Sequence, residues 1–92
     1  MIKNKSSKQL ERHFKGMANH WRIDILNLVA KVNDISLEDI ASRLECNIKT
    51  ISEHAKKLAQ SGLINKHYEG RTVAHSLSPY GKIFYDFIKT SF

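Results

Sequence analysis

The sequence predicts a mainly α-helical fold with one small β-hairpin, in the order α-α-α-α-β-β-α. Three observations support this prediction. Apolar residues recur at helical spacing from about residue 7 to residue 60. After Gly62 the apolar period changes to that of a strand, over two short runs. At Ser78-Pro79 the chain returns to helical spacing, because Ser suits an N-cap and Pro suits the first helical position.

The first two helices are predicted from their spacing. Residues 7–17, SKQLERHFKGM, place Leu10, Phe14 and Met17 at i, i+4 and i+7. Asn19 is a suitable N-cap for the next helix, HWRIDILNLVAKV, which Asn33-Asp34 interrupts. The apolar face of this second helix is broad and comprises Trp21, Ile25, Leu26, Val29 and Val32.

Two shorter helices follow. ISLEDIASRLE begins with Ser36 as its cap and has Asp39 three residues later, an Asp variant of the capping box. Its expected inward residues are Leu37, Ile40, Ala41 and Leu44. After a tight turn at Cys46-Asn47, Asn47 caps a helix that runs to about Gln60, and Gly62 follows in the C′ position. The expected core residues of this segment are Ile51, Ala55, Leu58, Leu63 and Ile64.

The strand-like runs LINKHYE and RTVAHSLS predict the hairpin, with its turn at Glu69-Gly70. The last helix, PYGKIFYDFIKTS, is rich in aromatic and branched residues. Residues 1–92 contain no repeats, linkers or low-complexity segments, so we expect a single domain, with residues 1–7 as a flexible basic arm. A domain of this size buries little surface alone, which favours a dimer.

The composition is basic, with 15 Lys and Arg against nine Asp and Glu and a formal net charge of +6. Such a domain attracts polyanions, either nucleic acid or an anionic membrane, although many basic proteins bind neither. The lone Cys46 excludes an intramolecular disulfide and favours a reducing, cytoplasmic setting. We expect no signal peptide, and the apolar runs fall short of the ~20 residues that cross a membrane.

Two short helices joined by a tight turn and followed by a β-hairpin form the winged helix-turn-helix plan. Three segments resemble the ArsR/SmtB-like repressors: ANHWRIDIL, IKTISEHAKKLAQSGLI and EGRTVAHSLS. The first is similar to that family's Ala-Asn-Pro-x-Arg-x-x-Ile-Leu pattern, with His20 in place of Pro. The second is similar to its recognition helix and the third to its wing. The resemblance covers roughly residues 10–80.

The resemblance implies a homodimer in which the first and last helices pack across a two-fold axis. The last helix supports this independently, because a terminal helix on a small domain cannot bury all of its apolar residues against its own core. The alternative is that this helix only covers the core of the protomer. The expected dimerisation residues are Leu10, Phe14, Ile83, Phe84, Phe87 and Ile88.

The resemblance also implies sequence-specific binding to double-stranded DNA by a transcriptional regulator, most simply a repressor. In this plan the N-terminal residues of the recognition helix meet base edges, its later lysines meet phosphates, and the helix N-terminus offers free N–H groups. For any one of these residues the alternative is a solvated surface charge. The expected DNA-binding residues are Ile48, Lys49, Thr50, Ser52, Glu53, Lys56 and Lys57 on the helix, and Lys66, His67 and Arg71 on the wing.

Neither metal site of the family can be transferred. The positions of the arsenic-sensing cysteine pair hold Ser36 and Glu38, and the last helix has Asp86 but no histidine. We therefore expect no metal ligands and no cofactor, and the effector stays unknown. A site built from Cys46 and histidines remains open, as does a redox role for Cys46.

No catalytic residues are expected, because the sequence has neither a Gly-rich phosphate loop nor a motif around a nucleophile. Two other functions remain open. The fold could serve as a protein-interaction module that does not read DNA. An amphipathic first or last helix could also bind a membrane surface, although Glu11 and Asp86 are placed unfavourably for that.

Overall fold

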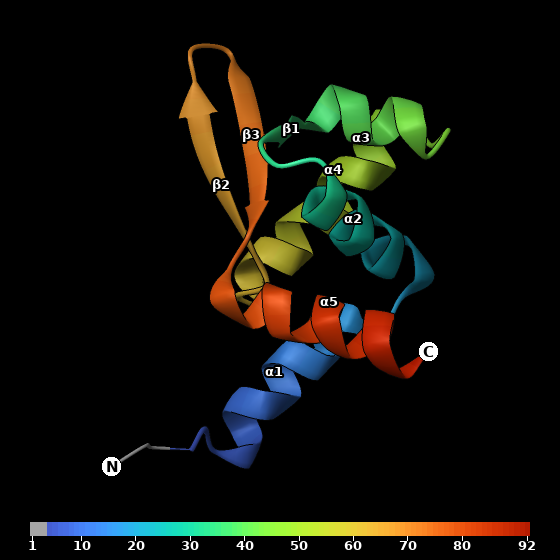
Figure 1. Cartoon of the computed structure of the whole chain (residues 1–92). Helices are drawn as coiled ribbons and strands as arrows, with labels where there is room; N and C mark the ends of the chain where they lie inside the picture. The colour runs from blue at the N-terminus through green and yellow to red at the C-terminus, as the bar shows by residue number, and fades with distance from the viewer. Residues whose placement is uncertain (1–3) are drawn as a thin grey trace.

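The computed structural model describes residues 4–92, and in this part of the chain four helices precede the hairpin and one follows it, as the spacing predicts (Figure 1). One short strand lies between the second and third helices. The elements are α1 (Ser7–Met17), α2 (His20–Lys31), β1 (Ile35–Ser36), α3 (Leu37–Arg43), α4 (Ile48–Gln60), β2 (Ile64–Glu69), β3 (Thr72–Leu77) and α5 (Pro79–Ser91). The mainly helical winged helix-turn-helix fold is thus confirmed.

Side-chain caps start the helices at the expected residues. Asn19 accepts the amides of Trp21 and Arg22, and Ser78 accepts the amide of Gly81. Ser36 accepts the amide of Asp39 at 3.1 Å, which is the first hydrogen bond of the expected capping box. A complete capping box at the start of α1, formed by Ser6 and Gln9, was not predicted from the sequence.

The predicted flexible arm of residues 1–7 stays a prediction. Met1, Ile2 and Lys3 lie outside the described residues. Of the remainder, Ser6 caps α1 and Ser7 begins it.

The sheet is three-stranded and antiparallel, in the order β1-β3-β2. The strand β1 was not predicted, because two residues are too few to show an alternating pattern. Its pairing with β3 joins Ile35 to His75. The predicted turn at Glu69-Gly70 was wrong by one residue. Glu69 pairs with Thr72 at the end of the ladder, and Gly70, at φ 64°, and Arg71 form the turn.

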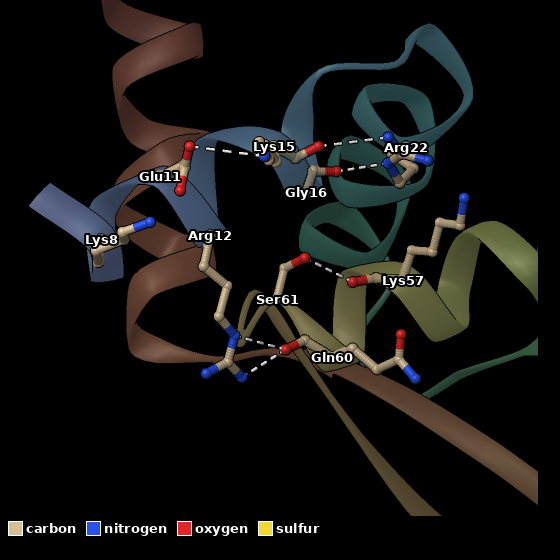
Figure 2. Close-up of a pocket in the computed structure, with 9 residues that line it drawn as sticks. All are labelled: Lys8, Glu11, Arg12, Lys15, Gly16, Arg22, Lys57, Gln60 and Ser61. Carbon is tan, nitrogen blue, oxygen red and sulfur yellow. Dashed lines mark hydrogen bonds and ion pairs between the residues drawn. The ribbon is translucent and has the colours of Figure 1, made fainter.

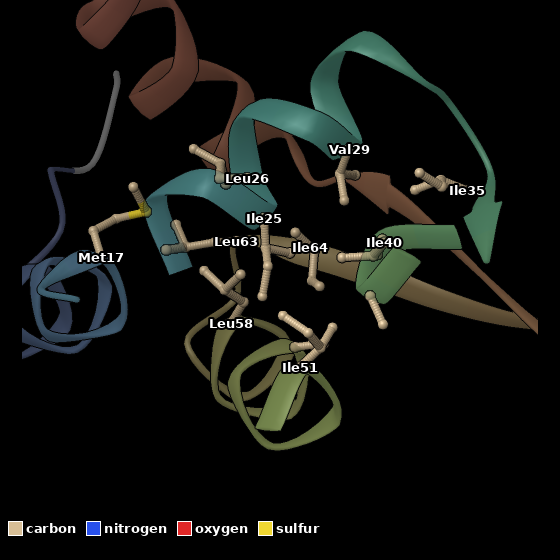
Figure 3. Close-up of a cluster of buried hydrophobic side chains, with 12 residues drawn as sticks. Met17, Ile25, Leu26, Val29, Ile35, Ile40, Ile51, Leu58, Leu63 and Ile64 are labelled. Atoms are coloured by element: carbon tan, nitrogen blue, oxygen red, sulfur yellow. The ribbon is translucent and has the colours of Figure 1, made fainter. Parts of the chain in front are cut away.

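The hydrophobic core lies between the helices and the sheet (Figure 3). Ile25, Ile40, Ile51, Leu58 and Leu63 are all fully buried. Each such side chain stabilises the fold by roughly 1.5–3 kcal/mol. All five core residues expected around the fourth helix are buried: Ile51, Ala55, Leu58, Leu63 and Ile64.

Two glycines allow α1 and α5 to approach the segment that follows α4. A Cβ at Gly16 would overlap the side chain of Ser61, and a Cβ at Gly81 would overlap the backbone carbonyl of Leu63. Because only glycine fits there, both terminal helices lie directly against residues 61–63, at the end of α4.

Candidate nucleic-acid interface

The helix α4 has one buried and one exposed face. Ile51, Ala55 and Leu58 are fully buried, since they recur at i, i+4 and i+7 on the side toward the core. The polar residues between them point outward, and all of the following are exposed: Lys49, Glu53, Lys56, Lys57 and Gln60. These five residues form what we call the polar stripe of α4.

The N-terminal turn of α4 is only partly available to a ligand. Ile48 and Lys49 are exposed, whereas Thr50 and Ser52 are half-buried. The side-chain oxygen of Asn47 accepts the amides of Lys49 at 2.7 Å and of Thr50 at 3.4 Å. Two of the amides that the sequence analysis offered to a phosphate are therefore already bonded.

The turn between α3 and α4 is tight. Glu45 has a positive φ of 51°, and the amide of Cys46 donates to the carbonyl of Ala41 at 3.0 Å. The Cys46 side chain is half-buried and packs against the core. This geometry fits its interpretation as a small turn residue and holds α4 at a defined angle to α3.

The wing, residues 64–77, carries exposed His67 and Arg71 and half-buried Lys66. Arg71 lies in the turn itself. His67 Nε2 lies 2.9 Å from a carboxylate oxygen of Asp34, which adopts a φ of 61° in the loop before β1. This contact ties the outer strand of the wing to the helical body, so His67 is engaged within the protein.

A buried histidine stabilises the base of the wing. His75, on β3, is 1% exposed, and its Nδ1–H donates to the carbonyl of Ile35 at 2.9 Å. Burial lowers the pKa of His75, and the nearby charge of Lys66 lowers it further. From the sequence, either a DNA contact or a packing role was possible for the wing histidines. The structure gives His75 a packing role, which its place in an alternating strand could have indicated.

Arg22 connects α1, α2 and α4, a role that the sequence analysis missed. Its Nε donates to the carbonyl of Gly16 at 2.7 Å, and its Nη1 donates to Nδ1 of His54 at 3.2 Å. Burial lowers the pKa of His54, and the charges of Arg22 and Lys57 add to this shift. This lowered pKa favours the neutral imidazole of His54, which lies on α4 itself and accepts the hydrogen bond of Arg22.

The six expected dimerisation residues lie along α1 and α5 and differ in exposure. Phe14 is 60% exposed and Ile83 is 62% exposed, and Leu10 and Phe87 are also exposed. Phe84 and Ile88 are half-buried and pack against the core, where Phe84 meets Phe14 edge to face at 5.2 Å between ring centroids. The Phe14–Phe84 contact brings α1 against α5, and we call the exposed members, Leu10, Phe14, Ile83 and Phe87, the apolar face.

The described residues show no candidate metal centre. Within residues 4–92, no three His, Cys, Asp or Glu side chains are grouped closely enough to hold an ion. Ser36, at one position of the family's cysteine pair, uses its hydroxyl to cap α3, and Asp86 is exposed on α5. None of the helices in this range has the length and apolar character that crossing a membrane requires.

One family model matches this chain, HVO_A0114, over residues 17–84. The transcriptional activator HlyU of Vibrio cholerae is 38% identical over 64 residues, which cover 70% of this chain and 58% of that protein. The arsenical resistance operon repressor of Escherichia coli K12 is 30% identical over 67 residues, covering 73% of this chain and 57% of the repressor. Both sequence matches thus span less than two thirds of the relative's own length.

Solved structures extend the likeness over nearly the whole chain. HlyU from V. cholerae has a TM-score of 0.86 at 30% identity, and the match covers 98% of each chain. A homodimeric winged helix-turn-helix DNA-binding domain from Mycobacterium bovis has a TM-score of 0.83 at 23% identity, covering 98% of this chain and 89% of that one. At that lower identity the second likeness shows the fold alone.

Proposed function

This chain belongs to the ArsR family of winged helix-turn-helix transcriptional regulators, and from that premise we propose that it binds operator DNA as a homodimer, with α4 in the major groove. The family consists of transcription regulators and not of enzymes. The observation that carries the proposal is the polar stripe of α4, which stays exposed while the opposite face is fully buried.

The base-reading role falls to the N-terminal half of α4. Lys49 donates to guanine O6 or N7, and Glu53 accepts from cytosine N4. Ile48, exposed at the helix start, contacts a thymine methyl group. Thr50 and Ser52 are half-buried, so their hydroxyls reach only bases that come close to the helix axis.

Phosphate contacts come from the later lysines and from the wing. Lys56 and Lys57 are exposed beyond the reading residues of α4. Arg71, in the wing turn, reaches the backbone or the minor groove, with Lys66 beside it on β2. His67 contributes only if its contact with Asp34 opens or is shared with a phosphate.

Dimerisation uses the apolar face of α1 and α5. An exposed patch that includes Phe14, Ile83 and Phe87 is costly in water and favours a second copy of the chain. The M. bovis domain, which shares this fold, is described as homodimeric, so the fold is compatible with this assembly. The recognition helices of a two-fold dimer then meet half-sites about 34 Å apart, or a multiple of that spacing.

Regulation follows from occupancy of the promoter. A dimer bound across a promoter excludes polymerase, so we propose repression in the cytoplasm, where the DNA lies. One relative is named an activator and another a repressor, so the position of the operator decides the outcome.

The test is fluorescence anisotropy with DNA from upstream of the gene and with a scrambled duplex of equal length, at two salt concentrations. We expect the wild type to prefer the upstream DNA by ~10³ or more. The double variant Lys49→Ala, Thr50→Ala should lose roughly 10- to 100-fold in affinity for the upstream DNA and much less for the scrambled one.

Arg71→Ala is the matched variant for backbone contacts. It should weaken binding to both duplexes alike and lower the slope of log affinity against log salt by about 1 per lost contact. If the wild type binds both duplexes equally and the Lys49, Thr50 double variant loses both equally, sequence reading is refuted. The protein-interaction module would then be the better account of the fold.

A further inference from the structure

An open pocket of about 480 Å³ lies where α1 and the start of α2 meet the C-terminal end of α4 (Figure 2). Its walls come from the consecutive helices α1 and α2 and from the more distant α4. Lys8 and Arg12 line it from α1, Arg22 from α2, and Lys57 from α4. None of the predicted dimerisation residues lines it, so the pocket is distinct from the apolar face.

The lining is strongly cationic. Lys8, Arg12, Lys15, Arg22 and Lys57 surround the pocket, and the acidic residue among the lining side chains is Glu11. Glu11 lies 3.6 Å from Lys15, but both side chains are more than half exposed, so this ion pair contributes little. Like charges gathered in one concavity repel one another, and a bound anion would relieve that repulsion.

The two arginines of the pocket are already engaged. Arg12 donates to the carbonyl of Gln60, and Arg22 donates to the carbonyl of Gly16, as the dashed lines in Figure 2 show. These bonds satisfy carbonyls at the C-terminal ends of α4 and α1, where the helix dipole is negative. Both arginines therefore shape the pocket and neutralise the dipoles, which leaves the lysine ammonium groups for a ligand.

Within residues 4–92, Lys8 and Lys57 form no ion pair with an acidic side chain. Lys57 also belongs to the polar stripe of α4, so the pocket continues the proposed DNA-binding surface. A helix as long as α4 spans about 20 Å, whereas the major groove is about 12 Å wide. With the N-terminal turn of α4 at the base edges, its C-terminal end reaches the backbone that borders the groove.

We propose that this pocket binds a phosphate group of the DNA backbone at the edge of the major groove. Lys8 and Lys15 of α1 contact the phosphate, Lys57 of α4 lines the opposite side of the pocket, and the two arginines hold the helix ends in place around it. The helix α1 thereby becomes a DNA-binding element as well as a dimerisation element. This inference rests on the proposed function and extends the footprint of each protomer by one phosphate.

The test removes the α1 lysines and keeps the arginines and all residues of α4. In the double variant Lys8→Gln, Lys15→Gln, binding to upstream and scrambled DNA should weaken by the same factor, roughly tenfold at low salt. The slope of log affinity against log salt should fall by about 1.8 for a dimer, because two phosphate contacts are lost. The preference for upstream over scrambled DNA should stay as in the wild type.

A charge-matched control separates a local contact from the general loss of positive charge. Lys82 and Lys89 lie on α5 and line a different pocket. The variant Lys82→Gln, Lys89→Gln removes the same charge, and its salt slope should stay near that of the wild type. Equal slopes for the Lys8, Lys15 variant and the wild type would refute the phosphate contact while leaving specific DNA binding, and so the proposed function, intact.

NMR titration identifies the source of the phosphate. Gly16 and Ser61 line the pocket, so the NMR signals of their amides report on its occupancy. We expect a short duplex to shift them at micromolar concentration and inorganic phosphate to leave them unchanged at millimolar concentration. Saturable shifts with inorganic phosphate and none with the duplex would assign the pocket to a small free anion and overturn the DNA contact.

Discussion

The guanidinium of Arg12, on α1, donates to the backbone carbonyl of Gln60, the last residue of α4, with an Nε–O distance of 2.9 Å. The next residue of α1 repeats the contact, since His13 Nδ1–H donates to the carbonyl of Ser61 at 2.7 Å. On the other side, the hydroxyl of Ser78 donates to the carbonyl of Gly62 at 2.6 Å. Residues of α1 and the N-cap of α5 thus both bind the backbone at the C-terminal end of α4, and α1 and α5 are the two proposed dimerisation helices.

Replacing Arg12 should weaken the attachment of α1 to α4. Arg12→Ala leaves the Gln60 carbonyl without its charged donor, so we expect the free energy of unfolding to fall by about 1.5 kcal/mol. Urea denaturation followed by circular dichroism measures this loss. The control is Lys8→Ala, which removes an exposed cation from the same helix and should lower the free energy of unfolding by under about 0.5 kcal/mol. Gln9→Ala is unsuitable as a control because Gln9 belongs to the α1 capping box. Equal losses for the Arg12 and Lys8 variants would contradict the capping role.

Adding a methyl group at Gly81 should be far more damaging than adding one at Gly70. A Cβ at Gly81 would overlap the carbonyl of Leu63, so Gly81→Ala must push α5 away from the end of α4 and should cost about 3 kcal/mol. Gly70 has a φ of 64° but nothing within 4 Å of a Cβ, so Gly70→Ala should cost only about 1 kcal/mol of backbone strain. The denaturant midpoints of the two variants show which substitution is more destabilising. A larger loss for Gly70→Ala than for Gly81→Ala would contradict the close contact between α5 and Leu63.

The buried His75 should make the fold sensitive to mild acid. Because burial lowers the pKa of His75 in the folded protein, the neutral form is the one that folding favours. Its contribution to stability is full above the unfolded pKa, near 6.5, and is lost as the pH falls below that value toward the folded pKa. His54 shifts in the same direction and adds to the effect.

Urea denaturation at several pH values between 7.5 and 5 measures this linkage. The free energy of unfolding of the wild type should fall with decreasing pH more steeply than that of His75→Gln, which cannot take up the proton. The variant will be less stable at neutral pH because it disturbs the contact with Ile35. The test therefore compares how steeply the free energy of unfolding changes with pH in the two proteins. Parallel curves would rule out His75 as the titrating group.

A charge on the apolar face should dissociate the proposed homodimer. Ile83 is 62% exposed in the protomer, so Ile83→Lys leaves the fold intact but places a charge in the interface. Sedimentation velocity should show a dimer for the wild type and a monomer for the variant. Tyr68→Lys is the matched control, because Tyr68 is 77% exposed but lies on the wing. A variant at Ile83 that stays dimeric would place the interface elsewhere.

The sequence by itself determined the local structure of this chain. Asn19, Ser36, Asn47 and Ser78 begin helices because their short polar side chains accept free amides of the first turn, and Gly62 ends α4 because its φ of 76° suits glycine. Helical spacing also determined which face of α4 is buried. These features depend on neighbouring residues only, which is why a pattern in the sequence can predict them.

Only the tertiary structure decided how the elements hold one another. The Arg12 contact with Gln60 joins residues 48 apart in the chain, and His75 reaches Ile35 over 40 residues. The strand β1, the contact of His67 with Asp34 and the cationic pocket arise in the same way. Periodicity reports the direction of a side chain on its own helix or strand. Its partner is set by how those elements pack, and that packing depends on the buried side chains of the whole domain together.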